Sequence, residues 1–238
     1  MDYIRRLTER YWATEVRTAE FVRIAAGKEI GHKIGDMVDE KTTRLLKDCG
    51  RFDIRHQQSR GQAAGRSMGD LWLEAGFIYN PVNIKAGEYG KNGQPNLVSL
   101  KRVLVALAGC LIDSYYLLIM KVGQTASGYE PHVYFVDMLD FLDYTVFNSG
   151  PGQMMLREAH FYPAVDALYQ AGLHAPEPTL SLSDKVEKLY GMLERADQQL
   201  YSDRERVRAQ IQEACLRYRE LPDARISRSR QEITFDLG

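Results

Sequence analysis

The segment Gly69–Asn96 constrains the fold of this 238-residue chain more than any other stretch. Its pattern is typical of two short strands, joined by a tight turn near 75–76, and followed by a polar loop with three glycines. Side chains alternate between the two faces of a strand, so Asn83 and Lys85 are expected on one face. The turn would place Asp70, which opens the first strand, opposite Asn83. The hairpin therefore gathers oxygen atoms and an ammonium group on one face of a sheet.

The composition is that of a globular protein without a basic excess, which limits the nucleic-acid partners it could bind. Hydrophobic residues make up 45% of the chain and charged residues 26%, as in an ordinary globular protein. The formal net charge is −1, so a nucleic-acid partner would need a locally basic cleft rather than a basic molecule.

Cysteine usage and hydropathy indicate a compartment. The three cysteines, Cys49, Cys110 and Cys215, are far apart and odd in number, which favours reduced thiols in a cytoplasm. The charged N-terminus lacks a signal-peptide core. The apolar runs at 103–112 and 115–122 are too short to span a bilayer. We therefore expect a soluble cytoplasmic protein with no membrane partner.

Hydrophobic spacing on either side of the hairpin predicts the remaining elements. Helices are expected over 2–26, 28–48, 97–109 and 183–220, and strands over 49–57, 112–123, 131–139 and 153–159. This order is typical of an α/β fold, with a mixed central β-sheet flanked by helices and a helical C-terminal region.

Several kinds of chemistry lack their motifs. The five histidines are scattered without metal-ligand spacing, which makes a zinc site improbable. No GxSxG elbow occurs, and no local motif suggests a Cys–His pair, so covalent catalysis has no support. The glycine-rich loop lacks the GKS or GKT of a nucleotide-binding P-loop. The hairpin residues remain as the candidate site.

Those hairpin residues suit a divalent metal. Mg²⁺ prefers oxygen ligands, commonly one or two carboxylates with water and substrate phosphate. Asp70 and the main-chain carbonyl of Ile84 would bind the metal, while Lys85 would position or deprotonate the water that attacks a phosphodiester. The alternative is a plain surface ion pair between Lys85 and either Glu88 or Asp70.

The surrounding sequence resembles a known family. PVNIKAGEYGKNGQPN at 81–96, followed by an apolar helix and SYYLLIMKV at 114–122, resembles the PD-(D/E)XK nucleases. The closest likeness is to type II restriction endonucleases of the branch that approaches DNA from the minor-groove side and often leaves blunt ends. The order of elements matches from about 28 to 139, about half of the chain. The resemblance implies a Mg²⁺-dependent site-specific deoxyribonuclease of a restriction–modification system, acting on double-stranded DNA.

Carried over by position, Asp70 matches the first metal-binding acid of the family and Lys85 matches its lysine. Asn83 stands where the family has its second acid, and an amide oxygen can bind a metal without bringing negative charge. This departure fits a natural variant, a disabled site, or a site completed by another acid, with Glu74 and Asp36 as candidates. If Asn83 is a degenerate acid position, Asn83→Asp should preserve or raise metal-dependent activity.

The resemblance also implies a DNA-binding surface. The residues expected to contact DNA near the site are Arg60, Arg66, Lys91, Asn92, Gln94 and Asn96. Neither face of the strand expected at 153–159 is cleanly apolar, so Gln153 and Arg157 are candidates for base recognition. Cleavage of both strands of a palindrome usually needs a two-fold homodimer, formed by the N-terminal helix or by the helix at 183–220.

The expected organisation is a single endonuclease domain, 1–238. Residues 1–27 would form a packing or dimer helix, 28–163 the catalytic α/β core, and 164–238 a helical subdomain with a basic tail. Two alternatives remain open at this stage. One is a repair or recombination nuclease of the same fold, and the other is a non-catalytic DNA-binding protein built on it.

Overall fold

The computed structural model describes residues 1–26, 30–49, 54–56, 68–75, 78–148, 152–176 and 179–220. The chain divides into two compact units, residues 1–194 and residues 195–238. The second unit contains the later turns of the long helix α6 (Leu182–Glu220), which confirms the helix expected at 183–220. Within the described residues, none of the helices has the length and apolar character needed to cross a membrane.

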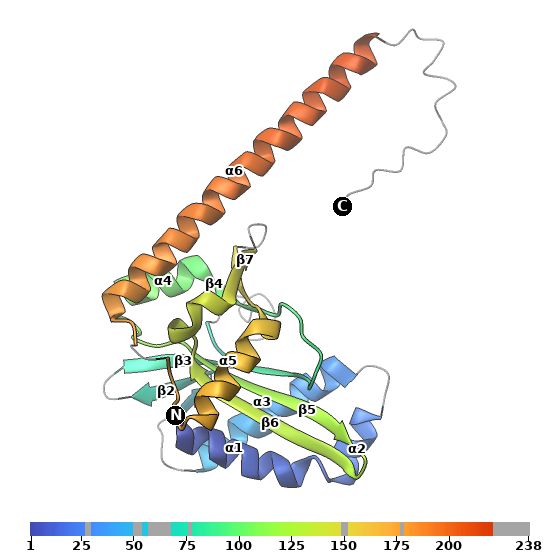
Figure 1. The fold of residues 1–238 in the computed structure, drawn as a ribbon, viewed down its shortest axis with the longest axis vertical. Helices are drawn as coiled ribbons and strands as arrows, with labels where there is room; N and C mark the ends of the chain where they lie inside the picture. Colours follow the sequence, from blue (N-terminus) through green and yellow to red (C-terminus); the bar gives the residue numbers. More distant parts are fainter. Residues whose placement is uncertain are drawn as a thin grey trace. The chain divides into compact units, whose positions relative to one another are not determined.

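The first unit is built on a five-stranded mixed sheet with the order β1-β2-β3-β5-β6 (Figure 1). Strands β3 and β5 run parallel, and every other neighbouring pair is antiparallel. The predicted class, a mixed sheet flanked by helices, is confirmed. The bounds are β1 (Ile54–His56), β2 (Leu71–Ala75), β3 (Ile78–Glu88), β5 (Tyr116–Thr125) and β6 (Gly128–Asp137).

A second, antiparallel sheet with the order β4-β8-β7 packs on one face of this main sheet. Its strands are β4 (Asn96–Ser99), β7 (Thr145–Asn148) and β8 (Gln153–Leu156). The same face also carries α4 (Leu100–Ala108), the 3-10 helix η2 (Met138–Tyr144), α5 (Glu158–Gln170) and the first turns of α6. The opposite face is covered by α1 (Asp2–Glu15), α2 (Ala19–Ala25) and α3 (Ile30–Asp48).

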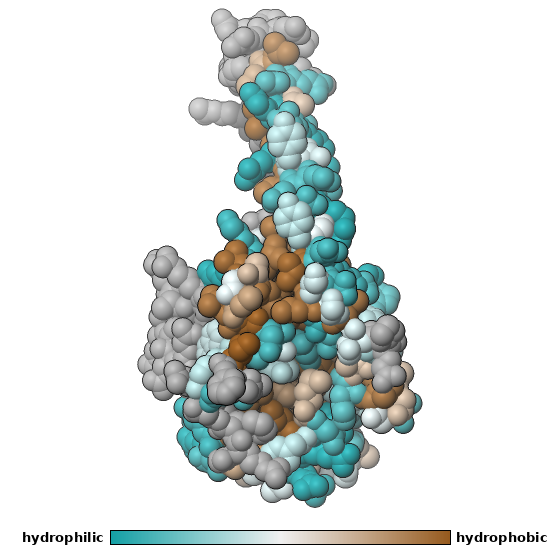
Figure 2. Space-filling model, turned by 90° about the vertical axis from the view of Figure 1, so that its left-hand side faces the viewer, coloured by the Kyte–Doolittle hydropathy of each residue, from teal (hydrophilic) through white to brown (hydrophobic). Residues whose placement is uncertain are grey.

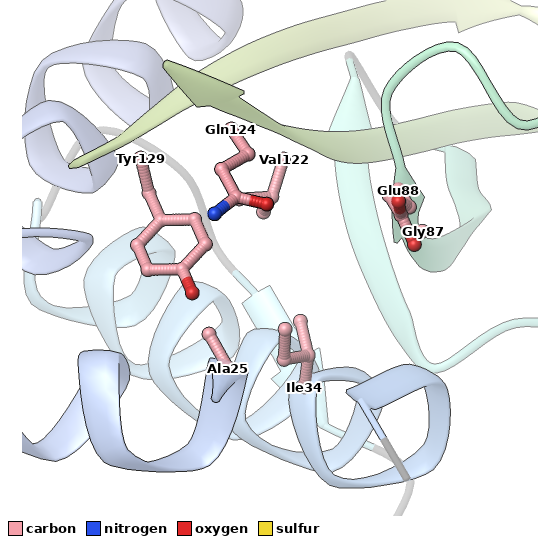
Figure 3. A pocket seen from close by; sticks show the side chains of 7 residues that line it. All are labelled: Ala25, Ile34, Gly87, Glu88, Val122, Gln124 and Tyr129. Atoms are coloured by element: carbon pink, nitrogen blue, oxygen red, sulfur yellow. The ribbon is translucent and has the colours of Figure 1, made fainter. Parts of the chain in front are cut away.

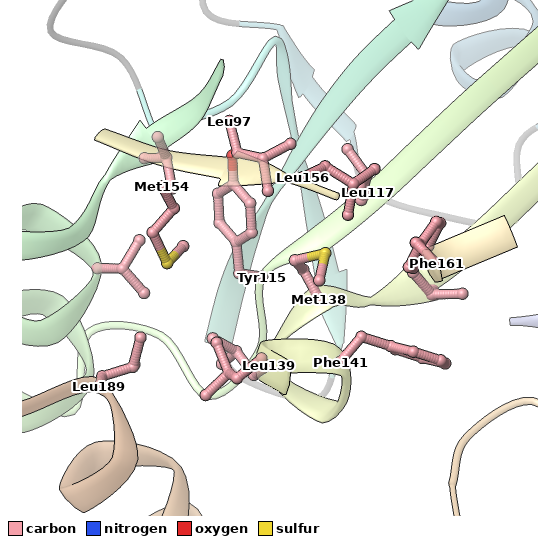
Figure 4. Packing of buried hydrophobic residues seen from close by; sticks show 14 of the residues in the cluster. Leu97, Tyr115, Leu117, Met138, Leu139, Phe141, Met154, Leu156, Phe161 and Leu189 are labelled. Atoms are coloured by element: carbon pink, nitrogen blue, oxygen red, sulfur yellow. The ribbon is translucent and has the colours of Figure 1, made fainter. Parts of the chain in front are cut away.

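Each face of the main sheet has its own hydrophobic core. On β5, Leu117 and Ile119 belong to the core under β4 and β8, whereas Leu118 and Met120 belong to the core under α1 and α3. A strand buried on both faces needs a continuous apolar run, which explains the LLIM segment. Figure 4 shows Tyr115 at the centre of the first core, between Leu97 of β4 and Leu139 of η2.

Two predicted helices were wrong in their bounds. The single helix expected over 2–26 is two helices, because Thr18 adopts extended backbone angles and its hydroxyl accepts a hydrogen bond from Phe21 N, capping α2. The helix expected over 97–109 begins only at Leu100. The four residues before it form β4, which pairs with β8 more than fifty positions later in the chain.

The segment from β8 into α5 also differs from what the sequence pattern predicted. Met154 and Leu156 of β8 are fully buried, so this strand does have an apolar face. The chain then enters α5 at Glu158, a helix that the hydrophobic pattern did not predict. The strands expected over 112–123 and 131–139 are confirmed as β5 and β6.

Apolar side chains also reach the surface. Val105 on α4 and Leu111 just after it are 61% and 69% exposed. Figure 2, viewed from the side on which Figure 1 draws α4, shows apolar surface gathered among polar surface.

Candidate functional site

Asp70 lies directly before β2 and is fixed to the neighbouring strand. Leu71 pairs with Val82 in the antiparallel register, so one step further Asp70 lies opposite Asn83, as the hairpin pattern predicted. The main-chain N–H of Asp70 donates to Val82 O at 2.8 Å, and Ile84 N donates to Asp70 Oδ2 at 2.6 Å. These bonds orient the half-buried carboxylate of Asp70 along β3.

Gly69 allows this close approach. A Cβ atom at this position would lie 2.8 Å from Val82 O and 2.9 Å from Val82 N, inside any normal contact distance. The obstacles are main-chain atoms of β3, which cannot move aside as a side chain can. The residue before Asp70 must therefore be glycine for the carboxylate to lie where it does.

Asn83 is buried, with 6% of its surface exposed, and its amide is held from two sides. Nδ2 donates to Leu97 O at 3.1 Å and to the Tyr115 hydroxyl at 3.0 Å. Because a carbonyl oxygen can only accept, the amide nitrogen must face Leu97. Oδ1 is thereby turned away from β4, and it has no hydrogen-bond partner among the described residues.

This arrangement gives a structural reason for an amide in place of the second acid. A carboxylate at this position would bring a charged oxygen against Leu97 O, with no proton to donate. Burial raises the pKa of the Tyr115 hydroxyl, and the negative charge of Asp70 raises it further, although the bond with Asn83 lowers it. Tyr115 is therefore a neutral neighbour of Asn83, and the Asp70 carboxylate lies close enough to act on it.

Lys85 lies two residues beyond Asn83 on the same face of β3 and is half-buried. The strand pairing places it beside Ile119 of β5. Within the described part of the chain its side chain forms neither a hydrogen bond nor an ion pair. The alternative expectation, an ion pair of Lys85 with Glu88 or Asp70, is therefore wrong for the described residues, and Glu88 pairs instead with Lys91 at 2.6 Å.

The candidate replacement acids are not brought to Asn83. Glu74 accepts a hydrogen bond from the Tyr79 hydroxyl at 3.0 Å and is four residues along β2 from Asp70, about 13 Å away. Asp36 is exposed on α3, which covers the opposite face of the sheet. Among the described residues there is no group of three or more His, Cys, Asp or Glu side chains placed to hold a metal.

The residues that do meet fit Mg²⁺ by their chemistry. Asp70 supplies one carboxylate, and Asn83 Oδ1 is a buried acceptor with no hydrogen-bond partner among the described residues. The N–H of Ile84 bonds to Asp70, and its carbonyl oxygen is the third expected ligand. Oxygen ligands with a low count of carboxylates are typical of Mg²⁺ sites that also use water and substrate phosphate.

A buried ion pair lies farther along the same face and was missed by sequence reasoning. Lys121 on β5 pairs in register with Gly87, and its Nζ is 2.9 Å from Glu158 Oε1 at the start of α5. The two side chains are 6% and 8% exposed. A lysine inside an otherwise apolar buried strand was the available signal, because such a charge needs a partner.

The predicted DNA-contacting residues fall into three groups. Lys91, Asn92, Gln94 and Asn96 are exposed, in the loop after β3 and at the start of β4. Arg157 is half-buried next to that loop, since Leu156 N donates to Pro95 O, whereas Gln153 is at the other end of β8, paired with Ser99. Arg60 and Arg66 lie outside the described residues.

A pocket between the sheet and its covering helices is separate from this site. Figure 3 shows Tyr129 and Gln124 of the sheet facing Ala25 and Ile34 of the covering helices. Gly87, Glu88 and Val122 complete its lining. It lies on the α2 and α3 side of the sheet and contains none of the hairpin residues that form the candidate metal site.

No protein-family model matches the chain, and a search of curated proteins finds no match. Support for a function therefore comes from the residues and their geometry. The strongest such arrangement is the set Asp70, Asn83 and Lys85.

Proposed function

We propose that the protein is a Mg²⁺-dependent type II restriction endonuclease that hydrolyses phosphodiester bonds at a short specific site in double-stranded DNA. The observation that carries the proposal is the shared face of Asp70, Asn83 and Lys85. At its centre lies the buried Asn83 Oδ1, which has no hydrogen-bond partner in the part of the chain that the structure describes. The mixed sheet, the helices on both of its faces and the exposed polar loop after β3 are compatible with the PD-(D/E)XK resemblance. We also propose that the protein is cytoplasmic and that it works with the DNA-modifying enzyme of a restriction–modification system.

The side chains divide the chemistry between them. Asp70, Asn83 Oδ1 and the Ile84 carbonyl would hold Mg²⁺, which supplies Lewis acidity at the scissile phosphate when bound. Lys85 would orient the attacking water, and its charge would stabilise the negative charge that develops on the phosphate oxygens. The bond from Ile84 N keeps the Asp70 carboxylate in place between turnovers.

Plasmid DNA incubated with the protein and Mg²⁺ tests this proposal. Discrete fragments are the expected result. Smears or structure-specific nicks would contradict site-specific cleavage and would indicate a repair or recombination nuclease of the same fold. DNA that stays intact under all divalent metals would overturn catalysis.

A non-catalytic DNA-binding protein is the second candidate, and one observation favours it. The hydrogen bonds to Leu97 and Tyr115 suit an amide at Asn83, which leaves Asp70 as the one described carboxylate at the site. Intact DNA together with a gel shift would support this candidate.

Cleavage of both strands at a palindrome suggests a homodimer. The described part of the second unit, residues 195–220, is helical and has exposed apolar side chains, which could pack on a second copy. They are Tyr201, Val207, Ile211 and Leu216. Light scattering should then give twice the 27.2 kDa mass of one chain, and a single-chain mass would contradict this part of the proposal.

A further inference from the structure

The loop between β3 and β4, residues 89–95, is anchored at both ends by its main chain. At its start, Tyr89 N donates to Val122 O at 2.8 Å, and the Tyr89 ring stacks on His132 with centroids 3.8 Å apart. At its end, Pro95 O accepts from Leu156 N at 3.0 Å. None of the residues 90–94 is apolar, so no hydrophobic side chain holds the middle of the loop.

Polar contacts hold the middle instead. Lys121 Nζ donates to Lys91 O at 3.1 Å, Gly93 N donates to Glu158 Oε2 at 2.8 Å, and Glu158 N donates to Gly93 O at 3.3 Å. The side chains of Lys91, Asn92 and Gln94 are exposed. The main chain of the loop therefore faces the protein, and its polar side chains face solvent.

The groups that hold the loop are themselves locked together. Lys121 and Glu158 form the buried pair at 2.9 Å, and Glu158 Oε1 also accepts from the Tyr162 hydroxyl at 2.7 Å. Lys121 Nζ lies 5.1 Å from the centre of the Tyr162 ring. Burying two charges carries a large desolvation cost, and apolar residues of similar size often serve stability equally well. The pair is better explained by what it fixes, which is the path of the loop.

We infer that Lys121 and Glu158 are positioning residues, whose buried pair presents Lys91, Asn92 and Gln94 to the phosphate backbone of a DNA duplex. That the loop contacts DNA rests on the proposed function, whereas the role of Lys121 and Glu158 in fixing the loop does not. Lys91 pairs with Glu88, but its side chain is 75% exposed, and exposed pairs are weak enough for a phosphate to displace. A loop already ordered in the free protein loses less conformational freedom on binding.

The double variant Lys121→Met/Glu158→Leu tests the inference without leaving an unpaired buried charge. Hydrogen exchange measured by mass spectrometry on peptides covering 89–95 should speed up by about tenfold or more, because Gly93 N–H and Lys91 O lose their partners. DNA affinity should fall by about tenfold and KM should rise, while kcat at saturating DNA changes by less than about threefold.

A cluster of three buried charges supplies the control. Lys185 Nζ is 2.6 Å from Asp140 and 3.3 Å from Asp137, with all three side chains at most 10% exposed, and among the described residues none of them forms a hydrogen bond or ion pair with the loop. Lys185→Met/Asp137→Asn/Asp140→Leu removes all three charges and keeps an oxygen at position 137 for the N–H groups of Tyr115 and Leu139, so it should leave both the exchange of residues 89–95 and DNA affinity unchanged. A fall in affinity equal to that of the first double variant would overturn the inference, because it would reflect general loss of stability.

A pair of glycine variants gives a milder test should the double variant fail to fold. A Cβ at Gly87 would lie 2.9 Å from Lys121 Nζ and would displace the ammonium, whereas a Cβ at Gly93 would lie 3.7 Å from Glu158 Oε2, an ordinary contact. Gly87→Ala should therefore loosen the loop and weaken DNA binding, and Gly93→Ala should change neither.

The two halves of the inference fail in different ways. Unchanged exchange of the loop in Lys121→Met/Glu158→Leu would overturn the positioning role, whatever the protein binds. Faster exchange with unchanged DNA affinity would overturn the role of the loop in DNA binding. Absence of any DNA binding by the wild-type protein would overturn the proposed function, and the exchange measurement would still decide the positioning role.

Discussion

Asn83→Asp changes one atom at the centre of the candidate site. The new oxygen would take the place of Nδ2, 3.1 Å from Leu97 O and 3.0 Å from the Tyr115 hydroxyl. Tyr115 can turn its proton toward a carboxylate, but Leu97 O cannot donate. The introduced charge would also lie near Asp70, in a position where the native side chain is 6% exposed.

The expected cost follows from these contacts. An unsatisfied buried carbonyl costs about 1–3 kcal/mol, and a buried charge left without a partner about 3–5 kcal/mol. The Tyr115 hydroxyl offsets part of the second value. We therefore expect the free energy of unfolding to fall by about 3 kcal/mol at pH 8 without divalent metal.

This cost depends on pH with a defined sign. Burial and the Asp70 charge raise the pKa of the introduced carboxyl above that of an unfolded aspartate. The loss of stability is therefore absent where the carboxyl is protonated in both states, and it grows as pH rises toward the folded-state pKa.

Urea unfolding in EDTA measures this effect. Asn92→Asp, which adds the same charge at an exposed loop position, should stay within about 0.5 kcal/mol of the wild type. Mg²⁺ at about a hundred times its dissociation constant should return about 2.7 kcal/mol to the Asn83→Asp protein. A loss below about 0.5 kcal/mol in EDTA would refute the reasoning from Leu97. The sequence-based expectation for this variant, metal-dependent activity that is preserved or raised, is measured separately with Mg²⁺ bound.

Two further variants test single contacts. Gly69→Ala should lower the free energy of unfolding by about 1–3 kcal/mol and reduce cleavage, because its Cβ would lie 2.8 Å from Val82 O; Gly35→Ala, which meets nothing within 4 Å, should not destabilise the protein. Equal stabilities of the two variants in urea unfolding would contradict the close approach at Asp70. Tyr115→Phe should cost about 1 kcal/mol below pH 10, and this difference should vanish by about pH 11. Burial raises the pKa of Tyr115 above its ordinary 10.0, so near pH 11 this tyrosine ionises in the unfolded state but not in the folded state. The wild type therefore loses stability there, and Tyr115→Phe, which has no hydroxyl at this position, does not. A difference that stays constant in urea unfolding up to pH 11 would contradict this.

The hairpin was predictable from sequence because its information is local. Strand alternation and a short turn determine that Asp70 lies opposite Asn83, and the apolar runs of β5 and β6 indicate strands buried on both faces. The strand β4 was not predictable in the same way. Asn96–Ser99 continues into an apolar helix, and only its pairing with β8, distant in the chain, makes it a strand.

The orientation of Asn83 could not be predicted either. It depends on Leu97 O from β4 and the Tyr115 hydroxyl from the start of β5, which meet only in the folded core. The lysine within the apolar run SYYLLIMKV indicated a buried charge at Lys121. Its partner Glu158 could not be predicted, because it lies at the start of a helix without a clear sequence signal. The local elements of the site were therefore accessible from sequence, and the contacts between elements were not.

Cleavage of plasmid DNA in Mg²⁺ by the wild type and by Lys85→Ala tests the central claim most directly. The wild type should give discrete fragments, and Lys85→Ala should give none while binding the same DNA within about threefold of the wild-type affinity. Lys101→Ala, which removes an exposed lysine from α4, is the matched control and should cleave normally. Retained cleavage by Lys85→Ala would contradict the assignment of the active site to the β2–β3 hairpin.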